Sequence, residues 1–417
     1  MRLASSHFTT HLASLCVSLG MANHVMAVID EDIQVSLRVR SAGHELDGNN
    51  ADSASILLRL SHRARWLDGL STFVEFDHVE TYLEDQFSDG VRLNGQPFVL
   101  DSEGTDLNQA FADIEHGDSL VRVGRQRLNF DDQRMVGGIS IWQNEQTFDA
   151  LQINHNIASG SVLSYTYAAN VNRVFGDEAE EFLTPDDVLF EPLNGRRPLA
   201  LLGDYNLNSH FLRLEYNEWD YSRLVSYGYF DDNQDRPEVT NRTIGLSYHF
   251  DFKVDALRYR LRIDGALQQR PEVDESSRIP YALLELAVRL NSLEFMSRTE
   301  MLGEDDNVAF VTPLASLHEF NGWADKFLLT PASGLVDQSL QMSWRNSPWR
   351  VSARYHVFSE YDGNSRYGDE IDLDLTYRLL DKHSLHLRYA YFREDQEFAA
   401  VFPDANKYFV TYAYNFN

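Results

Sequence analysis

The sequence is short of the features on which most enzymes and helical membrane proteins depend. It has one cysteine, Cys16, only four lysines, and no apolar run near the roughly 18 residues that predict a transmembrane helix. A lone cysteine excludes a disulfide framework and a cysteine-based metal site. No HExxH pair, no Gly-x-Ser-x-Gly turn and no phosphate-binding glycine loop occurs. We therefore expect no enzyme activity, no cofactor and no metal site.

The N-terminus has the pattern of a secretory signal peptide. A modest apolar segment over residues 12–21 precedes residues 25–27, Val-Met-Ala, which have the small-residue spacing of a cleavage site. We expect a signal peptide over residues 1–27 and a mature chain over residues 28–417. Ala22 is a rival cleavage point, and a frayed N-terminal helix is the alternative interpretation.

Apolar and polar residues alternate along most of the mature chain, which predicts β-strands with two different faces. About eighteen such segments occur, each close to the 9–11 residues that a tilted strand needs to cross a bilayer. They begin near residues 33, 53, 70, 109, 118, 147, 161, 208, 221, 240, 254, 280, 292, 337, 349, 369, 384 and 406. The segments predict an all-β fold, a transmembrane antiparallel β-barrel of eighteen strands. Sixteen strands is the alternative, because the segment at 109–114 is the weakest.

The connections between the segments differ in length. After even-numbered segments they are short, as at 115–117, 217–220, 291–292, 346–348 and 380–383. After odd-numbered segments they are longer, as at 81–108, 128–146, 171–207 and 302–336. Short periplasmic turns and long extracellular loops are typical of a barrel in the bacterial outer membrane, with both termini on the periplasmic side. A sandwich would not alternate in this way, and no repeated propeller blade is found.

The two faces of the segments predict which residues line the pore. An arginine facing lipid at the midplane costs about 2–4 kcal/mol, so the charged face must be the lumen. The chain has 36 basic residues, of which only four are lysine. Arginine binds carboxylates through two parallel hydrogen bonds, so an arginine-rich lumen favours anions. The expected pore-lining set includes Arg59, Arg258, Arg260, Arg262, Arg289, Arg298, Arg345 and Arg354. The alternative for any one of them is an ion pair with a lumenal acid that braces the wall.

One basic loop stands between two strand patterns, in the stretch 119–149. It carries Arg125, Arg127 and Arg134, with glycines as breaks. A loop this basic and polar fits the inside of a channel better than a packed core, so we expect it to form a constriction.

Other long connections have a different character. The net charge of −28 falls largely on acidic clusters in expected outer loops, as at 177–181 and 304–306. These are expected to be solvated faces or surface sites for divalent ions, although none has EF-hand spacing. The connection at 302–336 holds Trp323, Phe327, Leu328 and Leu329, which are too apolar for a free loop. We expect it to pack on the barrel rim or to enter the lumen.

Two blocks of sequence resemble the alginate export family of outer-membrane barrels. The first is GRQRLNFDDQRMVGG…QNEQTFDALQI, which begins at Gly124, and the second is FNGWADKFL…TP..GL.D, within residues 312–344. The resemblance implies an 18-stranded barrel over residues 28–417, an arginine-lined constriction and passage of an anionic polysaccharide. It also implies a pore role for Arg125, Arg127 and Arg134.

Three functions are therefore weighed. The first is a passive outer-membrane channel for an anionic polysaccharide such as alginate. The second is an uptake porin for anionic oligosaccharides or small anions, and the third, distant one is an outer-membrane hydrolase. Expected partners are the anionic saccharide, outer-membrane lipid and lipopolysaccharide, and periplasmic export or uptake proteins. No nucleic acid partner is expected, and the barrel should be a monomer.

Overall fold

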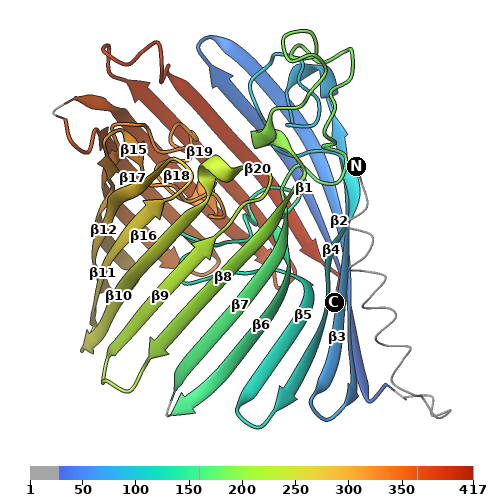
Figure 1. Cartoon of the computed structure of the whole chain (residues 1–417), viewed down its shortest axis with the longest axis vertical. Helices are drawn as coiled ribbons and strands as arrows, with labels where there is room; N and C mark the ends of the chain where they lie inside the picture. Colours follow the sequence, from blue (N-terminus) through green and yellow to red (C-terminus); the bar gives the residue numbers. More distant parts are fainter. Residues whose placement is uncertain (1–27, 159, 364, 417) are drawn as a thin grey trace.

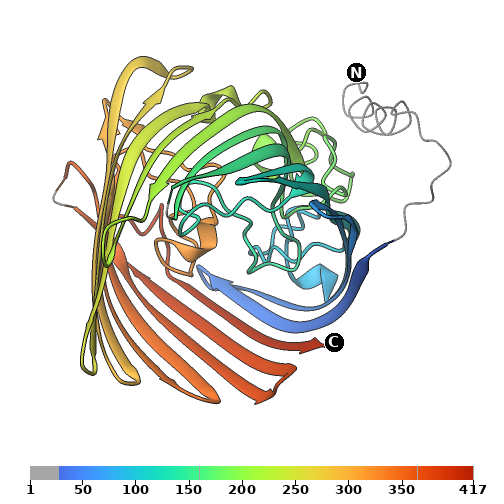
Figure 2. The ribbon, with the colours of Figure 1, turned by 90° about the horizontal axis from the view of Figure 1, so that it is seen from below.

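The computed structural model describes residues 28–158, 160–363 and 365–416, and a single β-sheet dominates it (Figures 1 and 2). The expected signal peptide, residues 1–27, lies outside the described residues. The strands of the sheet are β1 (Asp30–Leu46), β2 (Asn49–Leu67), β3 (Leu70–Tyr82), β4 (Gly104–His116), β5 (Ser119–Gln126), β6 (Thr147–Ala158), β7 (Ser161–Asn172), β8 (Asp204–Tyr216), β9 (Ser222–Asp231), β10 (Asn241–Val254), β11 (Leu257–Arg270), β12 (Asp274–Leu290), β13 (Leu293–Leu302), β16 (Leu335–Asn346), β17 (Trp349–Ser359), β18 (Arg366–Leu380), β19 (His383–Glu394) and β20 (Ala405–Asn415). Short elements in the loops are β14 (Glu304–Asp305), β15 (Val308–Ala309), η1 (Glu84–Gln86), η2 (Leu199–Leu201), η3 (Pro237–Val239) and η4 (Leu317–Glu319).

The sheet closes into a barrel. It has 18 strands, and every neighbouring pair is antiparallel. The first strand pairs with the last, from Ser36 opposite Asn415 to Leu46 opposite Ala405. Closure leaves no strand edge, so every strand has a hydrogen-bonding neighbour on both sides, as a sheet in lipid requires. The prediction of eighteen strands is confirmed and the alternative of sixteen is wrong.

The two ends of the barrel differ as expected, with two exceptions. The connections 68–69, 117–118, 255–256 and 381–382 lie at one end, and the loops 83–103, 127–146, 173–203 and 303–334 lie at the other. On the long-loop end, however, 47–48 and 271–273 are also short, so strict alternation was wrong there. Asp47 and Gly48 have φ of 49° and 75°. Positive φ at both central residues is what a two-residue hairpin turn needs, so Asp-Gly closes β1 and β2 without a longer loop.

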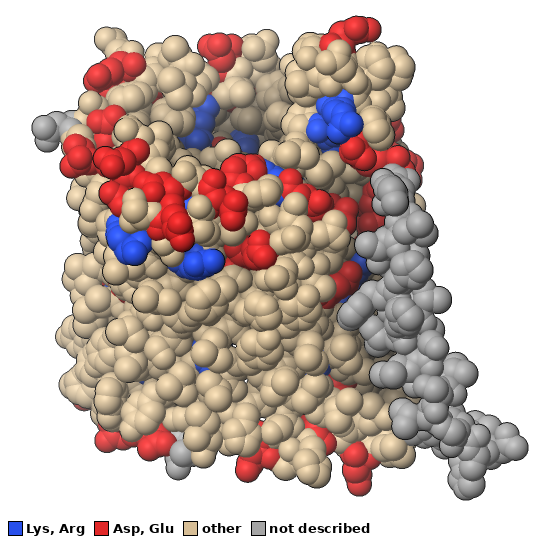
Figure 3. Space-filling view, viewed as in Figure 1, with Lys and Arg blue, Asp and Glu red and all other residues tan. Residues whose placement is uncertain are grey.

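The outer wall is apolar where the barrel would meet lipid. In the part of β12 from Leu284 to Leu290, the exposed residues are Leu284, Leu286, Val288 and Leu290, and the charged Glu285 and Arg289 lie at alternate, half-buried positions. Figure 3 shows a belt almost free of charged side chains between carboxylates at the two rims. Within the described residues, no helix is long and apolar enough to cross a membrane. The strands thus present a lipid face and a lumen face, as the alternation predicted.

The inside of the barrel is partly filled by its own loops (Figure 2). From loop 303–334, Phe310, Ala324 and Phe327 are buried in one apolar cluster with barrel residues that include Phe358 and Phe392. A second cluster joins loop 127–146 to the wall through Leu128, Phe130 and Val136, packed against Phe148, Phe211 and Tyr229. Burying one such side chain stabilises by about 1.5–3 kcal/mol. The expectation that the connection at 302–336 packs on the barrel is confirmed.

Candidate pore site

Loop 127–146 is paired with loop 303–334 inside the barrel. Gly137 N donates to Leu314 O at 2.9 Å, and Ile139 N donates to Ser316 Oγ at 2.9 Å. Gln146 Nε2 donates to Leu314 O at 3.0 Å. A Cβ on Gly137 would lie 2.5 Å from Ser316 Oγ, so only glycine allows this approach. The two loops therefore form one body, and each restrains the other.

Arg134 fastens this body to the wall. Its side chain is 4% exposed, and its Nε lies 2.8 Å from Glu300 Oε1 on β13. Its Nη2 donates to Asn321 Oδ1 in loop 303–334 at 2.9 Å. Glu300 is buried as well and accepts a hydrogen bond from Tyr281 at 2.8 Å. Arg134 therefore lies behind the pore surface as an anchor, and we correct the expectation that it lines the constriction.

The tip of loop 127–146 reaches arginines on a distant part of the wall. Asp131 lies 2.7 Å from Arg213 of β8. Asp132 pairs with Arg262 of β11 and lies 3.9 Å from Arg298 of β13. Burial opposes ionisation of Asp132, but Arg262 and Arg298 outweigh it and lower its pKa. Because the loop starts at β5 and ends at β6, these contacts carry it across the lumen.

Both of these wall arginines are also paired with wall acids. Arg262 contacts Asp264, and Arg298 lies 3.6 Å from Glu285 and 3.4 Å from Glu300. These pairs agree with the alternative interpretation of Arg262 and Arg298, in which a lumenal arginine forms ion pairs that brace the wall.

A second group of ion pairs holds the base of the same loop. Arg59 lies 2.6 Å from Asp77 and 2.8 Å from Glu145. Arg127 lies 2.5 Å from Glu75 and also pairs with Glu145. Burial opposes ionisation of Glu145, but the two arginines outweigh it and lower its pKa.

Arg125 is less tightly held than Arg59 and Arg127. It lies 2.9 Å from Asp149, and both side chains are partly exposed. The structure thus shows Arg59, Arg125 and Arg127 as paired groups.

The remaining predicted arginines form what we call the inner arginine patch: Arg258, Arg260, Arg289, Arg345 and Arg354. They occupy lumen-facing positions on β11, β12, β16 and β17, mostly near the short turns. Glu294 lies 2.9 Å from Arg260 and 3.9 Å from Arg345, and Asp251 pairs with Arg258. Arg289 has no carboxylate within 4.0 Å among the described residues, and neither has Arg354. Guanidinium groups therefore outnumber the carboxylates that form ion pairs with them in this patch.

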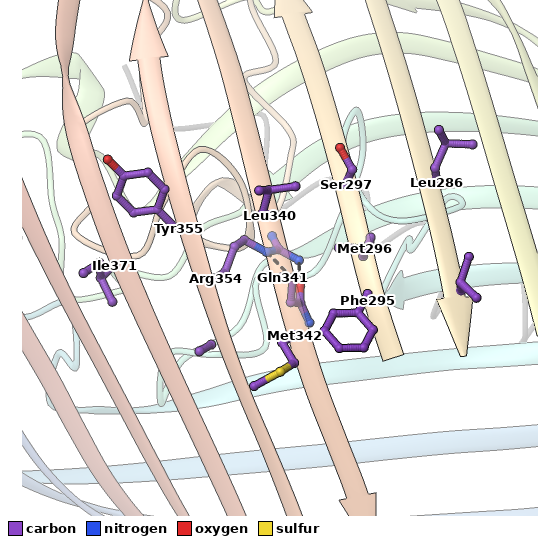
Figure 4. A pocket seen from close by; sticks show the side chains of 12 residues that line it. Leu286, Phe295, Met296, Ser297, Leu340, Gln341, Met342, Arg354, Tyr355 and Ile371 are labelled. Carbon is purple, nitrogen blue, oxygen red and sulfur yellow. Dashed lines mark hydrogen bonds between the residues drawn. The ribbon is translucent and has the colours of Figure 1, made fainter. Parts of the chain in front are cut away.

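Arg354 shows how the patch is held by the wall. It donates to Gln341 Oε1 on the neighbouring strand, with Nε at 2.8 Å (Figure 4). The same stretch of wall carries an open hollow of about 530 Å³, whose lining includes the outward-facing Phe295, Leu340 and Tyr355. Successive residues of β16 and β17 thus point alternately into the lumen and toward the lipid face.

Some residues of the site were not singled out from the sequence. Glu145, Asp131, Asp132 and Glu300 are the acids that fix the basic loop. Asp131 and Asp132 form an acidic pair between Arg127 and Arg134 in the sequence. Such a pair indicates a loop tip that forms ion pairs with arginines of the barrel wall. Nothing in the sequence pairs Arg134 with Glu300, since they are 166 residues apart.

Removal of the two tip acids should free wall arginines. We expect Asp131→Asn with Asp132→Asn to increase anion preference, because Arg213, Arg262 and Arg298 each lose a carboxylate partner. Reversal potentials across a planar bilayer in a salt gradient measure the change. Asp186→Asn with Asp306→Asn makes the same change of charge at exposed positions of two outer loops and should have a much smaller effect. Equal shifts in the two double variants would contradict the assignment of the tip.

Comparisons with known proteins agree with this fold. The alginate export family model matches residues 31–168, which supports the resemblance seen in the sequence. The solved structure of OccAB4 from Acinetobacter baumannii has a TM-score of 0.71 at 9% identity, over 94% of this chain and 99% of that chain. The structure of OccAB2 from Acinetobacter baumannii has a TM-score of 0.69 at 12% identity, over 94% of this chain and 99% of that chain. The structure of OpdK from Pseudomonas aeruginosa, solved with vanillate, has a TM-score of 0.66 at 12% identity, over 93% of this chain and 99% of that chain. No curated protein matches.

The closed barrel, whose lumen is partly filled by loops, has the fold of the outer-membrane porin structures. Within that class, its N-terminal part is similar to the alginate export family.

Proposed function

We propose that this channel passes anions passively, with small carboxylate-bearing solutes, short acidic oligosaccharides among them, as its substrate class. The observation that carries the proposal is the inner arginine patch, in which five arginines have only two carboxylates as ion-pair partners among the described residues, Asp251 and Glu294. Loops 127–146 and 303–334 narrow the lumen above it and are fixed there by ion pairs and apolar clusters. A narrowed lumen that ends in excess positive charge favours small anions.

Electrostatic range supports the same proposal despite the net charge of −28. Many of the acidic side chains visible in Figure 3 lie at the rims. Exposed charges farther apart than about 10 Å are largely screened at 0.1 M salt. Low-dielectric walls focus the field of nearby charges within a cleft, so the patch should govern the ions that reach it. Glu294 and Asp251 weaken the attraction of the patch for an anion. A bound anion must be held weakly enough to leave the channel.

A second candidate is passage of a long anionic polysaccharide such as alginate. The match to the alginate export model over residues 31–168 favours it. A polymer would have to pass the two lumenal loops, whereas a short anion needs only the space beside them. Both candidates describe a conduit rather than a catalyst. Under either, the saccharide or carboxylate, outer-membrane lipid, lipopolysaccharide and periplasmic export or uptake proteins are the proposed partners of a monomeric barrel.

Selectivity measurements test the leading proposal. We expect the wild-type channel to prefer anions, and Arg258→Gln, Arg289→Gln and Arg345→Gln together to lower that preference. The three side chains are at the lumen surface, so their loss should not disturb folding. A matched control replaces Arg196, Arg278 and Arg393 on the outer side by glutamine, and it should leave the reversal potential nearly unchanged. Cation preference in the wild type would overturn the proposal.

Blocking measurements separate the two candidates. Short uronate oligomers should block the current briefly and then pass. Long alginate should give lasting block if the lumenal loops stop polymers. Brief, length-dependent translocation of long chains would favour the polysaccharide candidate instead.

A further inference from the structure

A cavity of about 410 Å³ lies at the outer end of the lumen, away from the inner arginine patch. Loops 83–103, 127–146, 173–203, 232–240 and 303–334 contribute to it, together with the outer ends of β1 and β20. We propose that this cavity is a binding site for a small organic anion whose carboxylate is attached to an apolar ring or chain. The inference rests on the proposed function and deepens it, since it specifies the apolar group that carries the carboxylate of the solutes entering the channel from outside.

The cavity wall is largely apolar. Phe98 is 40% exposed and Leu329 is 70% exposed, although both stand on outer loops and not on the lipid face. Trp142, Phe175 and Leu201 complete much of this wall. Apolar side chains are exposed to water at this channel mouth. Binding an apolar ligand there would remove apolar surface from water, which is favourable. A saccharide would bring many hydroxyl groups to a wall that offers few partners, so an apolar body fits better.

The charged groups at the cavity are mainly cations. Lys407 Nζ lies 2.6 Å from Asp325 Oδ2, and His318 Nδ1 lies 2.7 Å from Asp325 Oδ1. Burial opposes ionisation of Asp325, but His318 and Lys407 outweigh it and hold its pKa well below the usual range. Asp325 is therefore already engaged by its two neighbours.

Two cavity cations lack a carboxylate partner within the described part of the chain. Arg173 donates to the carbonyls of Ala200 and Leu202, at 2.6 and 3.1 Å, and to the hydroxyl of Tyr205 at 2.9 Å. Lys326 lies 5.6 Å from the ring centroid of Phe392, and no carboxylate of the described residues lies within 4.0 Å of its ammonium group. A bound carboxylate would supply the missing charge.

Calorimetric titration of the detergent-solubilised full-length barrel tests the inference with three probes. Benzoate has the charge and the apolar ring, benzamide lacks the charge, and glucuronate lacks the apolar body. We expect one saturable site for benzoate and binding at least tenfold weaker for the other two. Equal affinity for benzoate and glucuronate would overturn the inference.

Two variants and a control locate the site. Lys326→Met should weaken benzoate binding about tenfold, the loss typical of one charge-assisted contact. Leu329→Gln, at a side chain too exposed to affect folding, should weaken benzoate but not glucuronate. Arg196→Met removes an exposed outer-loop cation and should change neither. Unchanged benzoate affinity in both Lys326→Met and Leu329→Gln would overturn the inference, even if one of them folded poorly.

A pH series adds an independent measurement. Burial, followed by the charge of Lys407, lowers the pKa of Lys326 to about 8, and Glu370, Asp404 and Glu394 oppose the shift. Benzoate affinity should therefore fall between pH 7 and pH 9.5 in the wild type, as Lys326 loses its proton, and the fall should be smaller in Lys326→Met. Equal falls in both proteins would exclude Lys326 as the carboxylate partner.

The reversal potential separates failure of this inference from failure of the proposed function. An anion-selective channel that does not bind benzoate refutes only the outer site. A cation-selective channel that binds benzoate refutes the proposed function.

Discussion

Replacing Arg134 by methionine is expected to release loop 127–146 from the barrel wall and to raise single-channel conductance. The ion pair with Glu300 is buried, with side chains 4% and 1% exposed. Removing one partner of such a pair costs about 3–5 kcal/mol, because the other charge is left buried without compensation. Arg298, 3.4 Å from Glu300, would offset part of that cost.

Chymotrypsin cleavage at Phe130 or Trp142 measures this release, since neither site is altered by the substitution. When opening is fast, the cleavage rate follows the population of the open loop, and 1.4 kcal/mol corresponds to a factor of ten. We therefore expect cleavage to accelerate by about a hundredfold or more.

A matched pair of variants makes the result specific. Arg125→Met breaks the ion pair with Asp149, whose side chains are 24% and 30% exposed. Partly exposed pairs contribute about 0–1 kcal/mol, so cleavage should change less than about tenfold. Arg134→Met combined with Glu300→Gln should be closer to wild type than Arg134→Met alone, because the unpaired charge is gone. If Arg134→Met behaved like Arg125→Met, the anchor role would be wrong.

The barrel could be predicted from the sequence because lipid and lumen impose opposite chemistry on alternate residues. A register slip by one residue would place the arginines of β11 in lipid, so the pattern is strict along most strands. It fails in β4, where Leu107 pairs with Phe76 and Gln109 pairs with Glu75, which leaves Asn108 as an extra residue. Asn108 and Gln109 both donate to Glu75, so two successive side chains face the lumen there. This bulge explains why the segment at 109–114 was the weakest.

The site was harder to predict because its contacts join loops to distant strands. Alternation identifies Arg262 and Arg354 as lumenal. It does not show that Arg262 binds Asp132, whereas Arg354 donates to Gln341 and has no carboxylate within 4.0 Å in the described part of the chain. Arg134 resembles Arg125 and Arg127 in the sequence, yet it alone turns away from the pore, toward Glu300. Whether a lumen arginine binds a solute or braces a wall depends on the acids that the fold brings to it.

Replacing Phe327 by alanine is expected to free loop 303–334 while the barrel stays folded. The ring is 4% exposed, and its centroid lies 4.6 Å from that of Phe358, 5.0 Å from that of Phe402 and 5.6 Å from that of Tyr367. Truncating a buried phenylalanine to alanine costs about 3–5 kcal/mol. The barrel should survive this loss, because its strands are held by hydrogen bonds on both sides and the loop is held mainly by such side chains.

Trypsin cleavage after Lys326 measures the freed loop, and heat-modifiable gel mobility reports the intact barrel. We expect cleavage to accelerate by about a hundredfold or more and conductance to rise, because 3–5 kcal/mol corresponds to about a hundredfold to a few thousandfold. Leu329→Ala is the matched control in the same loop. Leu329 is 70% exposed, so its truncation should change cleavage little. Similar cleavage rates in Phe327→Ala and Leu329→Ala would show that the aromatic cluster does not hold the loop in the lumen.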